Sequence, residues 1–556
     1  MSLQFITGNS GNGKTKYLFN RIVKEAKANP SDNYLVIVPE QFTMQTQRQL
    51  VDLSENKAIM NIDVLSFKRL AYRVFDELGI TNLTVLEETG KNLVLRKLAA
   101  QEADKLGVIG RNLNRIGYIS EVKSLLSELV QYNISPEELG RYIASGRLSD
   151  TLSDKLKDVL VLYEAFEKFM QDKYITAEEI LNVLSNVAEE SAILRNSVIA
   201  FDEFTGFTPI QNQLIKKLFV ISKKIYVTLT IDCREDIFKS RGMQELFDMP
   251  KRTVKSLTEM AAFYGIEVEE PIILDKNYRL AENEELSFME QQLFRKRRCS
   301  FKKVPKHIHI DCLRDPKQEL TKIARRINEL VRNENLRYRD IAIVTGDVNI
   351  YAGYVREIFD KYNIPYFIDA TQEILFHPFI EFIRSIPDIA AQHFSADAVF
   401  RFLRCGFTEL SASEIDVLEN YVLACGVRGK SAWDKKWVRL PKHKAGYDLE
   451  LLNQSREYIM ELLKPVYQVF SDKKSTVKDY VLAIYKLIVS LDIPDKLAKK
   501  EQALLDAGDQ TASKEYGQIY KIVMQLFEKY VAVLGDECMD AEEFTQILDA
   551  GLDAAD

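Results

Sequence analysis

Near its beginning the chain reads LQFITGNSGNGKT over residues 3–15, an alternating apolar run that breaks into glycines and ends in Lys-Thr. Its last eight residues fit the pattern G-x-x-x-x-G-K-[ST], and apolar side chains follow at helical spacing. A strand, a glycine-rich turn and a helix in this order point backbone N–H groups at a phosphate. We therefore predict a nucleoside triphosphate site formed by Gly8, Asn9, Ser10, Gly11, Asn12, Gly13, Lys14 and Thr15.

An acidic pair that could complete this site follows the apolar run at 198–201. Asp202 is predicted to hold Mg²⁺ together with Thr15, while Lys14 reaches the β- and γ-phosphate oxygens. Glu203 is predicted to orient the attacking water. A solvated strand end is the duller alternative, and the pairing with the loop favours the metal role. The predicted cofactors are ATP and Mg²⁺.

Strand and helix signals alternate after the loop, which predicts a parallel sheet with helices on its faces. The strand signals lie at 34–38, 62–65, 198–201 and 225–230. Between 85 and 195 the spacing of apolar residues is almost purely helical, so a helical domain is expected to interrupt the sheet. The fold class predicted is α/β.

A second α/β run is expected after a basic stretch. Residues 307–311 and 341–344 look like strands on either side of a helix at 317–332, which predicts a βαβ unit. The expected organisation is a lobe formed by 1–84 and 196–294, a helical insertion at 85–195, a basic linker at 295–306, the first part of a second lobe at 307–376, and a second helical insertion, expected to be truncated, at 377–556.

Composition restricts the possible partners. The 556 residues exceed what one core can hold, so several structural units are expected. A net charge of −7 argues against wholesale binding of nucleic acid, so any DNA contact must be local. No apolar run approaches the roughly 18 residues of a membrane span, and a cytoplasmic protein with no membrane partner is expected. The six cysteines form no CxxC and have no neighbouring histidines, which predicts neither a zinc site nor a disulfide framework.

The tripeptide Asn277-Tyr278-Arg279 is a third candidate element of the nucleotide site. Arg279 could point to the γ-phosphate as an arginine finger, and Tyr278 could stack on the base. The alternative is a surface helix start with a packed tyrosine. From the residues alone the alternative is favoured.

Several segments, in order along the chain, resemble superfamily 1 helicases of the UvrD/RecB type, and most closely the AddB-like subunits of bacterial helicase-nucleases. They are Ile37–Thr43, Leu65–Arg73, Asp202–Pro209, Asn277–Arg279 and Leu418–Gly426. The resemblance implies two RecA-like P-loop NTPase lobes, the second incomplete, each with a large helical insertion. It also implies that Tyr278 and Arg279 face the nucleotide.

The same resemblance implies contacts with single-stranded DNA from Gln41, Phe42, Thr43, Ser66 and Phe67. Helicases of this type hold phosphates with polar groups and place aromatic rings under bases. Taken singly, Ser66 and Phe67 could instead cap and staple a helix, and Gln41 could be a loop amide.

Departures from the helicase pattern bear on whether the chain is a motor. Thr205 and Gly206 stand where active motors have Gln and Asp, and no coupling glutamine is evident near 232–238. The resemblance implies a non-motor, ATP-binding subunit that pairs with an AddA-type helicase-nuclease subunit. Such a heterodimer processes double-strand breaks for homologous recombination, binds single-stranded and double-stranded DNA, and recognises Chi.

Full-length members of the family also carry a 5′–3′ single-strand exonuclease domain with a 4Fe–4S cluster, which is expected outside these 556 residues. Two other functions stay open. One is an autonomous DNA-dependent ATPase and translocase of the UvrD type, which the retained Lys14, Asp202, Glu203 and Arg279 would permit. The other is a small-molecule kinase, which the helical insertions and the second α/β run disfavour.

Overall fold

The computed structural model describes residues 1–80, 85–86, 88–108, 118–145, 148–170, 174–295, 299–369, 374–441 and 447–553. The chain forms two compact units. Unit 1 contains Met1–Val85, Ser127–Ser135 and Asp172–Glu319, and unit 2 contains Leu86–Leu126, Pro136–Gln171 and Leu320–Asp556. Each unit has its own hydrophobic core, and each is described by itself.

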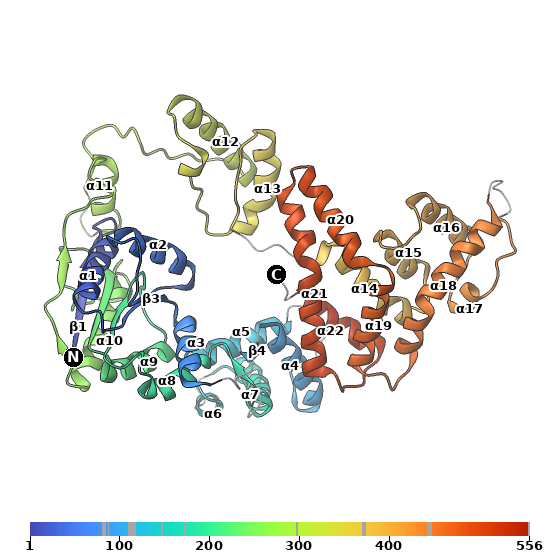
Figure 1. Ribbon diagram of the computed structural model, residues 1–556, viewed down its shortest axis with the longest axis horizontal. Coiled ribbons are helices and arrows are strands. Elements are labelled where there is room, and N and C mark those ends of the chain that lie inside the picture. Colours follow the sequence, from blue (N-terminus) through green and yellow to red (C-terminus); the bar gives the residue numbers. More distant parts are fainter. Residues whose placement is uncertain are drawn as a thin grey trace. The chain divides into compact units, whose positions relative to one another are not determined.

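Unit 1 is built on one sheet. Its strands are β1 (Ser2–Gly8), β2 (Tyr34–Ile37), β3 (Ile62–Leu65), β6 (Val198–Phe201), β7 (Lys224–Thr230), β8 (Glu267–Val268) and β9 (Ile272–Leu274) (Figure 1). Its helices are α1 (Lys14–Ala28), α2 (Thr43–Leu53), α3 (Phe67–Leu78), α8 (Ile180–Val187), α9 (Pro209–Ile221), α10 (Asp248–Phe263) and α11 (Glu284–Gln292). Short 3-10 turns lie at Glu40–Phe42 and Ala188–Glu190. The four strands predicted from alternation are thereby confirmed.

The sheet has the strand order β3-β2-β6-β7-β1-β8, with β9 also paired to β1. Its pairings are parallel, with Gly8 opposite Thr230 and with Phe201 opposite Ile37. In a parallel sheet the carboxyl ends of the strands meet at one edge, where ligands bind in open α/β folds. The phosphate loop, Asp202 and the segments after β2 and β3 therefore share that edge.

Helices cover both faces of this sheet because its strands alternate between two cores. Leu3 and Phe5 pack in one core with α3, α9 and α10, while Ile6 packs in the other with α1 and α2. Residues of a strand point to opposite faces in turn, so a strand buried on both faces reads as a nearly continuous apolar run. The helices begin at sequence-encoded caps: Ser66 caps α3, and Thr208 forms a capping box at the start of α9.

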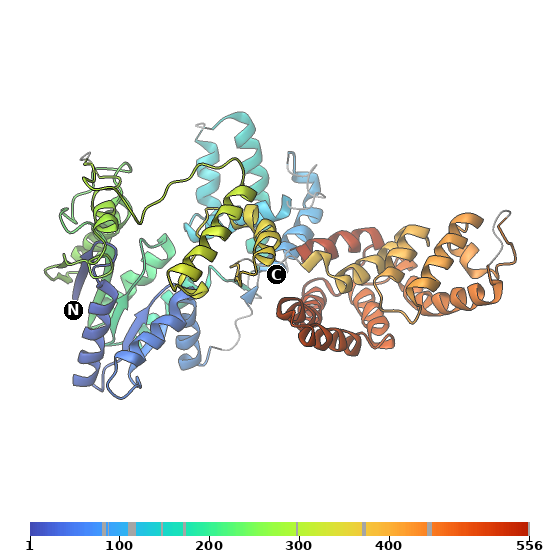
Figure 2. The ribbon, with the colours of Figure 1, turned by 90° about the horizontal axis from the view of Figure 1, so that it is seen from above.

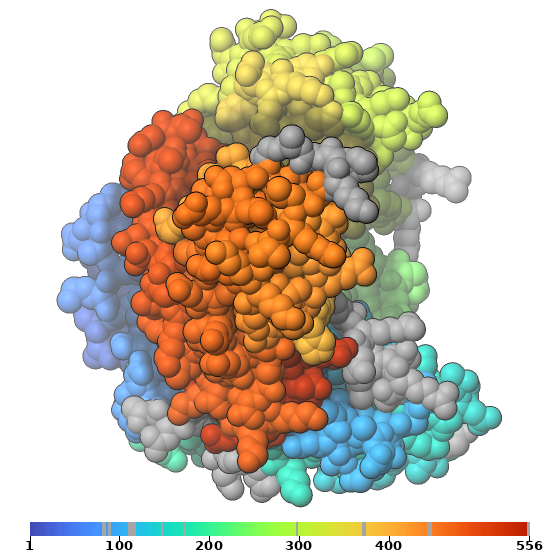
Figure 3. Space-filling view, turned by 90° about the vertical axis from the view of Figure 1, so that its right-hand side faces the viewer, coloured from blue at the N-terminus to red at the C-terminus, as the bar shows by residue number. Residues whose placement is uncertain are grey.

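Unit 2 is helical. Its helices are α4 (Glu88–Gln101), α6 (Pro136–Ala144), α7 (Asp150–Met170), α13 (Val348–Lys361), α14 (Pro378–Ala391), α15 (Ala396–Arg404), α16 (Ala412–Cys425), α17 (Lys430–Asp434), α18 (Leu449–Ser471), α19 (Val477–Ser490), α20 (Ile493–Asp506), α21 (Gln510–Leu534) and α22 (Ala541–Asp553). In Figure 2, α14 to α22 (gold to red) form an extended array, and the orange part of it faces the viewer in Figure 3.

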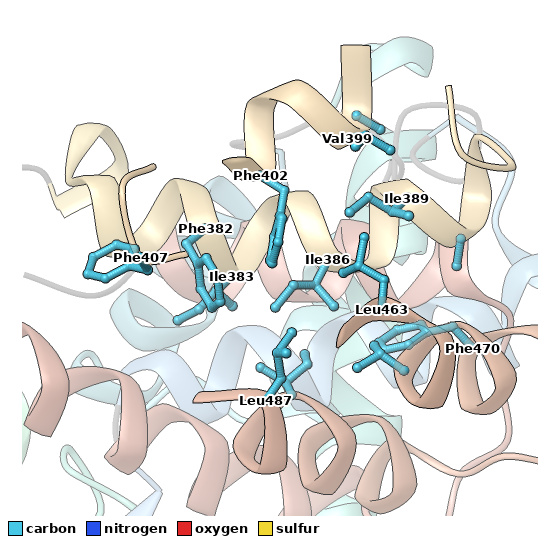
Figure 4. Packing of buried hydrophobic residues seen from close by; sticks show 14 of the residues in the cluster. Phe382, Ile383, Ile386, Ile389, Val399, Phe402, Phe407, Leu463, Phe470 and Leu487 are labelled. Atoms are coloured by element: carbon cyan, nitrogen blue, oxygen red, sulfur yellow. The ribbon is translucent and has the colours of Figure 1, made fainter. Parts of the chain in front are cut away.

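Part of the large core of unit 2 lies between α14, α15, α18 and α19. Phe382 and Ile386 of α14 point toward Phe402 of α15, Leu463 of α18 and Leu487 of α19 (Figure 4). Burying such side chains contributes about 1.5–3 kcal/mol each. None of the helices in the described ranges combines the length and the apolar character that crossing a membrane requires.

The regions around the unit boundaries include two short strands, β4 (Val85–Leu86) and β5 (Ile175–Thr176), and the helices α5 (Tyr118–Gln131) and α12 (Pro316–Asn333). Helices α4 to α8 lie between 85 and 195, where the sequence predicts a helical pattern, and the inserted domain with these bounds stays a prediction.

The second βαβ unit is not formed as predicted. Helix α12 is present, but residues 307–311 and 341–344 have no strand structure, and Ile310 and Val344 are 94% and 92% exposed. An alternating segment becomes a strand only when another backbone pairs with its N–H and C=O groups. Neither segment belongs to a sheet among the described residues.

Candidate functional site

The phosphate loop connects β1 to α1 with a backbone that requires glycine at two positions. Gly11 and Gly13 have φ of 86° and 77°, in the left-handed region. Gly13 directly precedes α1, and no side chain caps the first N–H groups of that helix. Uncapped N–H groups at a helix N-terminus, presented by a glycine loop, are the donors that phosphate groups use.

Close neighbours also exclude side chains from the loop. A Cβ on Gly8 would lie 2.6 Å from the carbonyl oxygen of Leu274, and one on Gly11 would lie 2.8 Å from Asn277 Oδ1 and 2.9 Å from Arg279 Cβ. The glycines are therefore needed for packing as well as for conformation.

The Lys14 ammonium group is held by the loop itself. Its Nζ donates to the carbonyl oxygens of Gly8 and Asn9, both at 3.1 Å. Burial lowers the pKa of Lys14, and the nearby Glu203 and Asp202 carboxylates oppose that shift. Neutral carbonyls are weaker partners for an ammonium group than phosphate oxygens, so an anion in the loop would attract Lys14 away from them.

Asp202 stands at the carboxyl end of β6 with one oxygen satisfied and one not. The carboxylate is 1% exposed, its Oδ1 accepts a hydrogen bond from the Thr228 hydroxyl, and its Oδ2 is buried with no hydrogen-bond partner. Burial raises the pKa of Asp202 more than the Thr228 hydrogen bond lowers it. A buried carboxylate oxygen without a partner is destabilising unless a cation or a donor completes it.

Thr15 and Glu203 lie beside Asp202. The Thr15 hydroxyl donates to Glu203 Oε1 at 3.2 Å, and Glu203 itself has φ of 63°. The oxygens of Thr15, Asp202 and Glu203 suit Mg²⁺, which proteins commonly hold with one or two carboxylates, the remaining positions going to phosphate and water. The residues present therefore fit the predicted ATP and Mg²⁺.

The Asn277–Arg279 segment is tied to the phosphate loop by its backbone. The N–H groups of Tyr278 and Arg279 donate to the carbonyl oxygen of Gly11 at 3.0 and 3.3 Å, and Asn277 Nδ2 donates to the carbonyl oxygen of Ser10 at 3.0 Å. The Tyr278 ring lies over Gly13, is 65% exposed, and has Lys276 Nζ 5.0 Å from its centroid. The structure thus brings Tyr278 and Arg279 to the loop, and their roles toward base and phosphate stay predictions.

A polar network at the loop was missed by the sequence analysis. Asn9 is almost fully buried; its Oδ1 accepts the N–H of Cys233 at 2.9 Å, and its Nδ2 donates to Glu290 of α11 at 3.0 Å. Arg295 lies 3.8 Å from the same Glu290 oxygen and binds Asp232 at 2.9 Å. Asn9, Asp232 and Arg295 each lie in or beside a segment that the sequence singled out, but nothing in the sequence joined them to one another or to Glu290.

Asp232 differs from Asp202 in being fully paired. Its two oxygens accept hydrogen bonds from Arg234 at 2.9 and 2.6 Å, and Arg295 adds a third. Burial alone would raise the pKa of Asp232, but the hydrogen bonds from Arg234 and Arg295 outweigh it and hold that pKa well below its usual range. This carboxylate is committed to ion pairs within the protein.

The predicted DNA-contacting residues after β2 lie at the same sheet edge. Gln41 is exposed and Phe42 is half-buried against the core beneath α1 and α2. Thr43 is buried, and its hydroxyl donates to the carbonyl oxygen of Glu40 at 2.9 Å. Gln41 and the edge of Phe42 are the groups of this segment that a DNA strand could reach.

The residues predicted after β3 are partly committed to the fold. Phe67 is 7% exposed and packs with Phe201, Phe204 and Phe207, its ring centroid 5.6–6.3 Å from theirs. We call these four rings the phenylalanine cluster. Ser66 is buried and caps α3 by accepting the N–H of Arg69 at 3.3 Å. The helix-capping interpretation of Ser66 is present in the structure, while DNA contact by either residue stays a prediction.

A carboxylate joins these two segments. Glu40 accepts a hydrogen bond from the Ser66 hydroxyl and one from Arg69 Nε at 2.9 Å. The Ser66 hydrogen bond, with help from Arg69, holds the pKa of Glu40 below its usual value despite some burial. We call Glu40, Ser66 and Arg69 the Glu40 cluster. A hydroxyl and a guanidinium, two groups that suit a phosphate, are here occupied by an internal anion.

The basic stretch at 295–306 is described only in part, because residues 296–298 lie outside the described ranges. Arg295 belongs to the polar network rather than to a solvated linker. Lys303 pairs with Glu284 at the surface.

Comparisons with known proteins agree on one family. A family model described as "ADDB, N-terminal" matches residues 5–290, which is 286 of the 556 residues. Curated proteins whose names identify them as the B-type subunit of an ATP-dependent helicase/deoxyribonuclease are similar along the chain. That of Lachnoclostridium phytofermentans is 38% identical over 99% of this chain and 49% of its own length.

Two further relatives bear the same name. The protein of Clostridium acetobutylicum is 32% identical over 99% of this chain and 48% of its own length, and that of Clostridioides difficile is 31% identical over 100% and 49%. The chain thus spans about half the length of the curated relatives it matches. With the loop, the acidic pair and the Asn-Tyr-Arg segment assembled at one sheet edge, the chain belongs to the AddB family.

Proposed function

We propose that the carboxyl edge of the unit 1 sheet binds ATP with Mg²⁺. The observation that carries this proposal is Asp202 Oδ2, a buried oxygen without a partner, next to a glycine loop with uncapped N–H groups. An apo protein tolerates such an arrangement at a cost in stability, and a site that receives a cation and an anion together removes that cost.

Each residue of the site has a distinct role in this proposal. The N–H groups of the loop hold the phosphates, and Lys14 exchanges two backbone carbonyls for phosphate oxygens. Thr15 and Asp202 hold Mg²⁺, which neutralises phosphate charge when bound. Glu203 orients a water molecule toward the γ-phosphate, and Arg279 binds that phosphate.

The role in the whole protein is inferred from the family. The names of the relatives describe the B-type subunit of an ATP-dependent helicase/deoxyribonuclease. We infer that this chain serves such an enzyme as an ATP-binding, helicase-like part that pairs with an AddA-type subunit. In this role it contacts single-stranded DNA through Gln41, Phe42, Thr43, Ser66 and Phe67. Thr205 and Gly206, which replace the motor residues Gln and Asp, support a non-motor role, in which ATP holds a conformation. Chi recognition and the cytoplasm as location belong to the same proposal.

Nucleotide affinity of the Lys14→Ala variant tests the site. Charge-assisted hydrogen bonds contribute about 1.5–3 kcal/mol, so the Kd for a fluorescent ATP analogue should rise by roughly 10- to 150-fold. Lys16→Ala, which removes an exposed lysine two residues further along α1, is the matched control and should change the Kd less than twofold. Equal affinities of Lys14→Ala and the unmodified protein would refute the proposed site.

ATP hydrolysis distinguishes the non-motor role from the alternative translocase. The juxtaposition of Lys14, Asp202, Glu203 and Thr15 is the observation that favours the alternative. The non-motor proposal predicts less than a threefold change in steady-state hydrolysis when single-stranded DNA is added. Stimulation by tens of fold that Lys14→Ala abolishes would establish the translocase instead.

A further inference from the structure

Helix α11 contacts the phosphate loop at one end and the segment 299–307 at the other. Both contacts are made by side chains of the helix, the first to a residue 281 positions away and the second to the segment that follows the helix, and all of these residues lie within unit 1. In Figure 1, α11 is the light-green helix labelled near the start of the yellow-green connecting segment.

The contact with the loop is directional. The N–H of Cys233 can only donate, so it fixes the Asn9 amide with Oδ1 toward Cys233 and Nδ2 toward Glu290. Asn9 is 4% exposed, and burial strengthens both hydrogen bonds. The backbone carbonyl of the same residue holds Lys14 Nζ. Any movement of Lys14 toward a phosphate therefore begins at a residue that Glu290 anchors.

The contact with the following segment is made by Glu285. Its carboxylate is buried and accepts the backbone N–H groups of Lys306 and His307 at 2.7 and 2.8 Å. Phe288, one turn further along, packs on Phe301 with ring centroids 5.3 Å apart. The chain between 299 and 307 is thus held to α11 by the Glu285 carboxylate and the Phe288 ring, and an exposed Glu284–Lys303 ion pair is added to them.

Helical geometry links the two contacts. Glu285 and Glu290 are five residues apart, which is about 7.5 Å along a helix axis. The i→i−4 backbone hydrogen bonds of this nine-residue helix connect the turns that carry the two residues. A displacement of Glu290 therefore displaces Glu285.

We propose that Glu290 is a positioning residue for the nucleotide site, and that through α11 it couples nucleotide occupancy of the phosphate loop to the segment 299–307. The proposal rests on the proposed ATP site. In this proposal α11 transmits nucleotide binding to a neighbouring segment. The coupling glutamine expected of a motor is not evident near 232–238, the segment that Asn9 contacts through Cys233.

Amide hydrogen exchange at Lys306 and His307 tests the coupling. In the unmodified protein, saturating ATPγS with Mg²⁺ should change the exchange rate of these two amides by at least about fivefold, which corresponds to about 1 kcal/mol. Glu290→Ala should abolish the nucleotide-dependent change and weaken ATPγS binding by about five- to tenfold. Glu290→Gln keeps an acceptor for Asn9 and should restore both.

Two further variants separate coupling from folding. Glu284→Ala removes an ion pair between α11 and Lys303. Because both side chains are exposed, the pair contributes little, and the nucleotide-dependent change in exchange should stay as in the unmodified protein. Glu285→Gln should speed exchange at Lys306 and His307 without changing nucleotide affinity. Thermal melting of every variant shows whether it is folded. If Glu290→Ala is not folded, Glu290→Asp takes its place, because its shorter side chain withdraws the carboxylate from Asn9.

The outcomes distinguish this inference from the function on which it rests. If ATPγS does not bind the unmodified protein, or binds equally to Lys14→Ala, the ATP site itself is refuted. If ATPγS binds through Lys14 but the exchange at Lys306 and His307 is unaffected, or responds equally in Glu290→Ala, the coupling is overturned and the ATP site stands.

Discussion

The two halves of the carboxyl edge of the unit 1 sheet differ in whether their charged side chains are paired with other side chains. In the half around β1, β6 and β7, Asp202 Oδ2 has no partner and Lys14 binds only backbone carbonyls. In the half after β2 and β3, Glu40 pairs with Ser66 and Arg69, and the Phe67 ring is covered. The first half is open to a cation and an anion, and the second is closed by its own residues. Helicase-like sequence in both halves therefore does not mean that both are ready to bind.

The largest effect is expected from Phe67→Ala, which tests whether the Phe67 ring is part of the hydrophobic core or is available to DNA. Phe67→Ala should lower the free energy of unfolding by about 3–5 kcal/mol, because it empties the centre of the phenylalanine cluster. Urea denaturation followed by circular dichroism measures this loss. Phe263→Ala, at a ring that is 82% exposed in the same unit, is the control and should cost less than about 0.5 kcal/mol. A stable Phe67→Ala variant with reduced DNA affinity would show instead that the ring serves as a stacking platform.

Asp202 and Asp232 are buried at the ends of neighbouring strands in the first half, and they differ in whether the carboxylate is fully paired. Asp232→Asn should destabilise unit 1 by about 3–5 kcal/mol, since it breaks buried ion pairs. Asp202→Asn should stabilise the apo protein on the order of 1 kcal/mol, since it removes an uncompensated charge. It should also lower the Mg²⁺-dependent part of ATP affinity about tenfold, measured as the difference with and without EDTA. Destabilisation by both variants would contradict the contrast.

The pH dependence of stability should follow the same contrast. The folded-state pKa of Asp232 is depressed, so its contribution is present above the unfolded pKa of about 3.9 and is lost as the pH falls. The folded-state pKa of Asp202 is raised, so its unfavourable charge develops as the pH rises through that value. Between pH 4 and pH 2, Asp232→Asn should therefore lose stability less steeply than the unmodified protein. Between pH 7 and pH 4, Asp202→Asn should lose stability more steeply than the unmodified protein, because it lacks the carboxylate whose protonation relieves the buried charge.

The smallest effect is expected from a variant that frees Ser66 and Arg69, in the second half of the edge, to bind DNA. Glu40→Gln removes the anion that occupies Ser66 and Arg69, and affinity for a labelled single-stranded oligonucleotide should rise about two- to fivefold. Asp63→Asn removes the same charge beside Arg73, where the ion pair is 3.9 Å long, and should raise affinity less. Fluorescence anisotropy at 50 and 200 mM salt measures both. Equal gains from the two variants would mean that only net charge matters.

Local patterns predicted the parts of this molecule that local physics determines. The strands at 62–65 and 198–201 have the predicted bounds, since each is an apolar run ended by a turn or a cap. The loop from Gly8 to Thr15 was predictable because its glycines are required by the backbone itself. The segments 307–311 and 341–344 have comparable strand signals in their sequences, yet such a signal cannot supply a pairing partner.

Contacts between residues that are far apart in the sequence could not be predicted from the sequence alone. Asn9 and Glu290 are 281 positions apart, and nothing in the spacing of either residue points to the other. Phe67 was predicted to contact DNA because of its motif, but the rings that cover it follow a different strand, at 201, 204 and 207. Whether a side chain is exposed depends on such neighbours, and a single sequence without a fold does not identify them.

Glu203 keeps a side chain in a backbone conformation that suits glycine. Its φ of 63° costs about 1–2 kcal/mol for a residue with a Cβ, and glycine would remove that penalty. A lineage in which the carboxylate had no use would gain stability by replacing it, so drift should carry this position toward glycine or asparagine. The residue that related proteins have at this position therefore indicates whether the carboxylate is still needed for function.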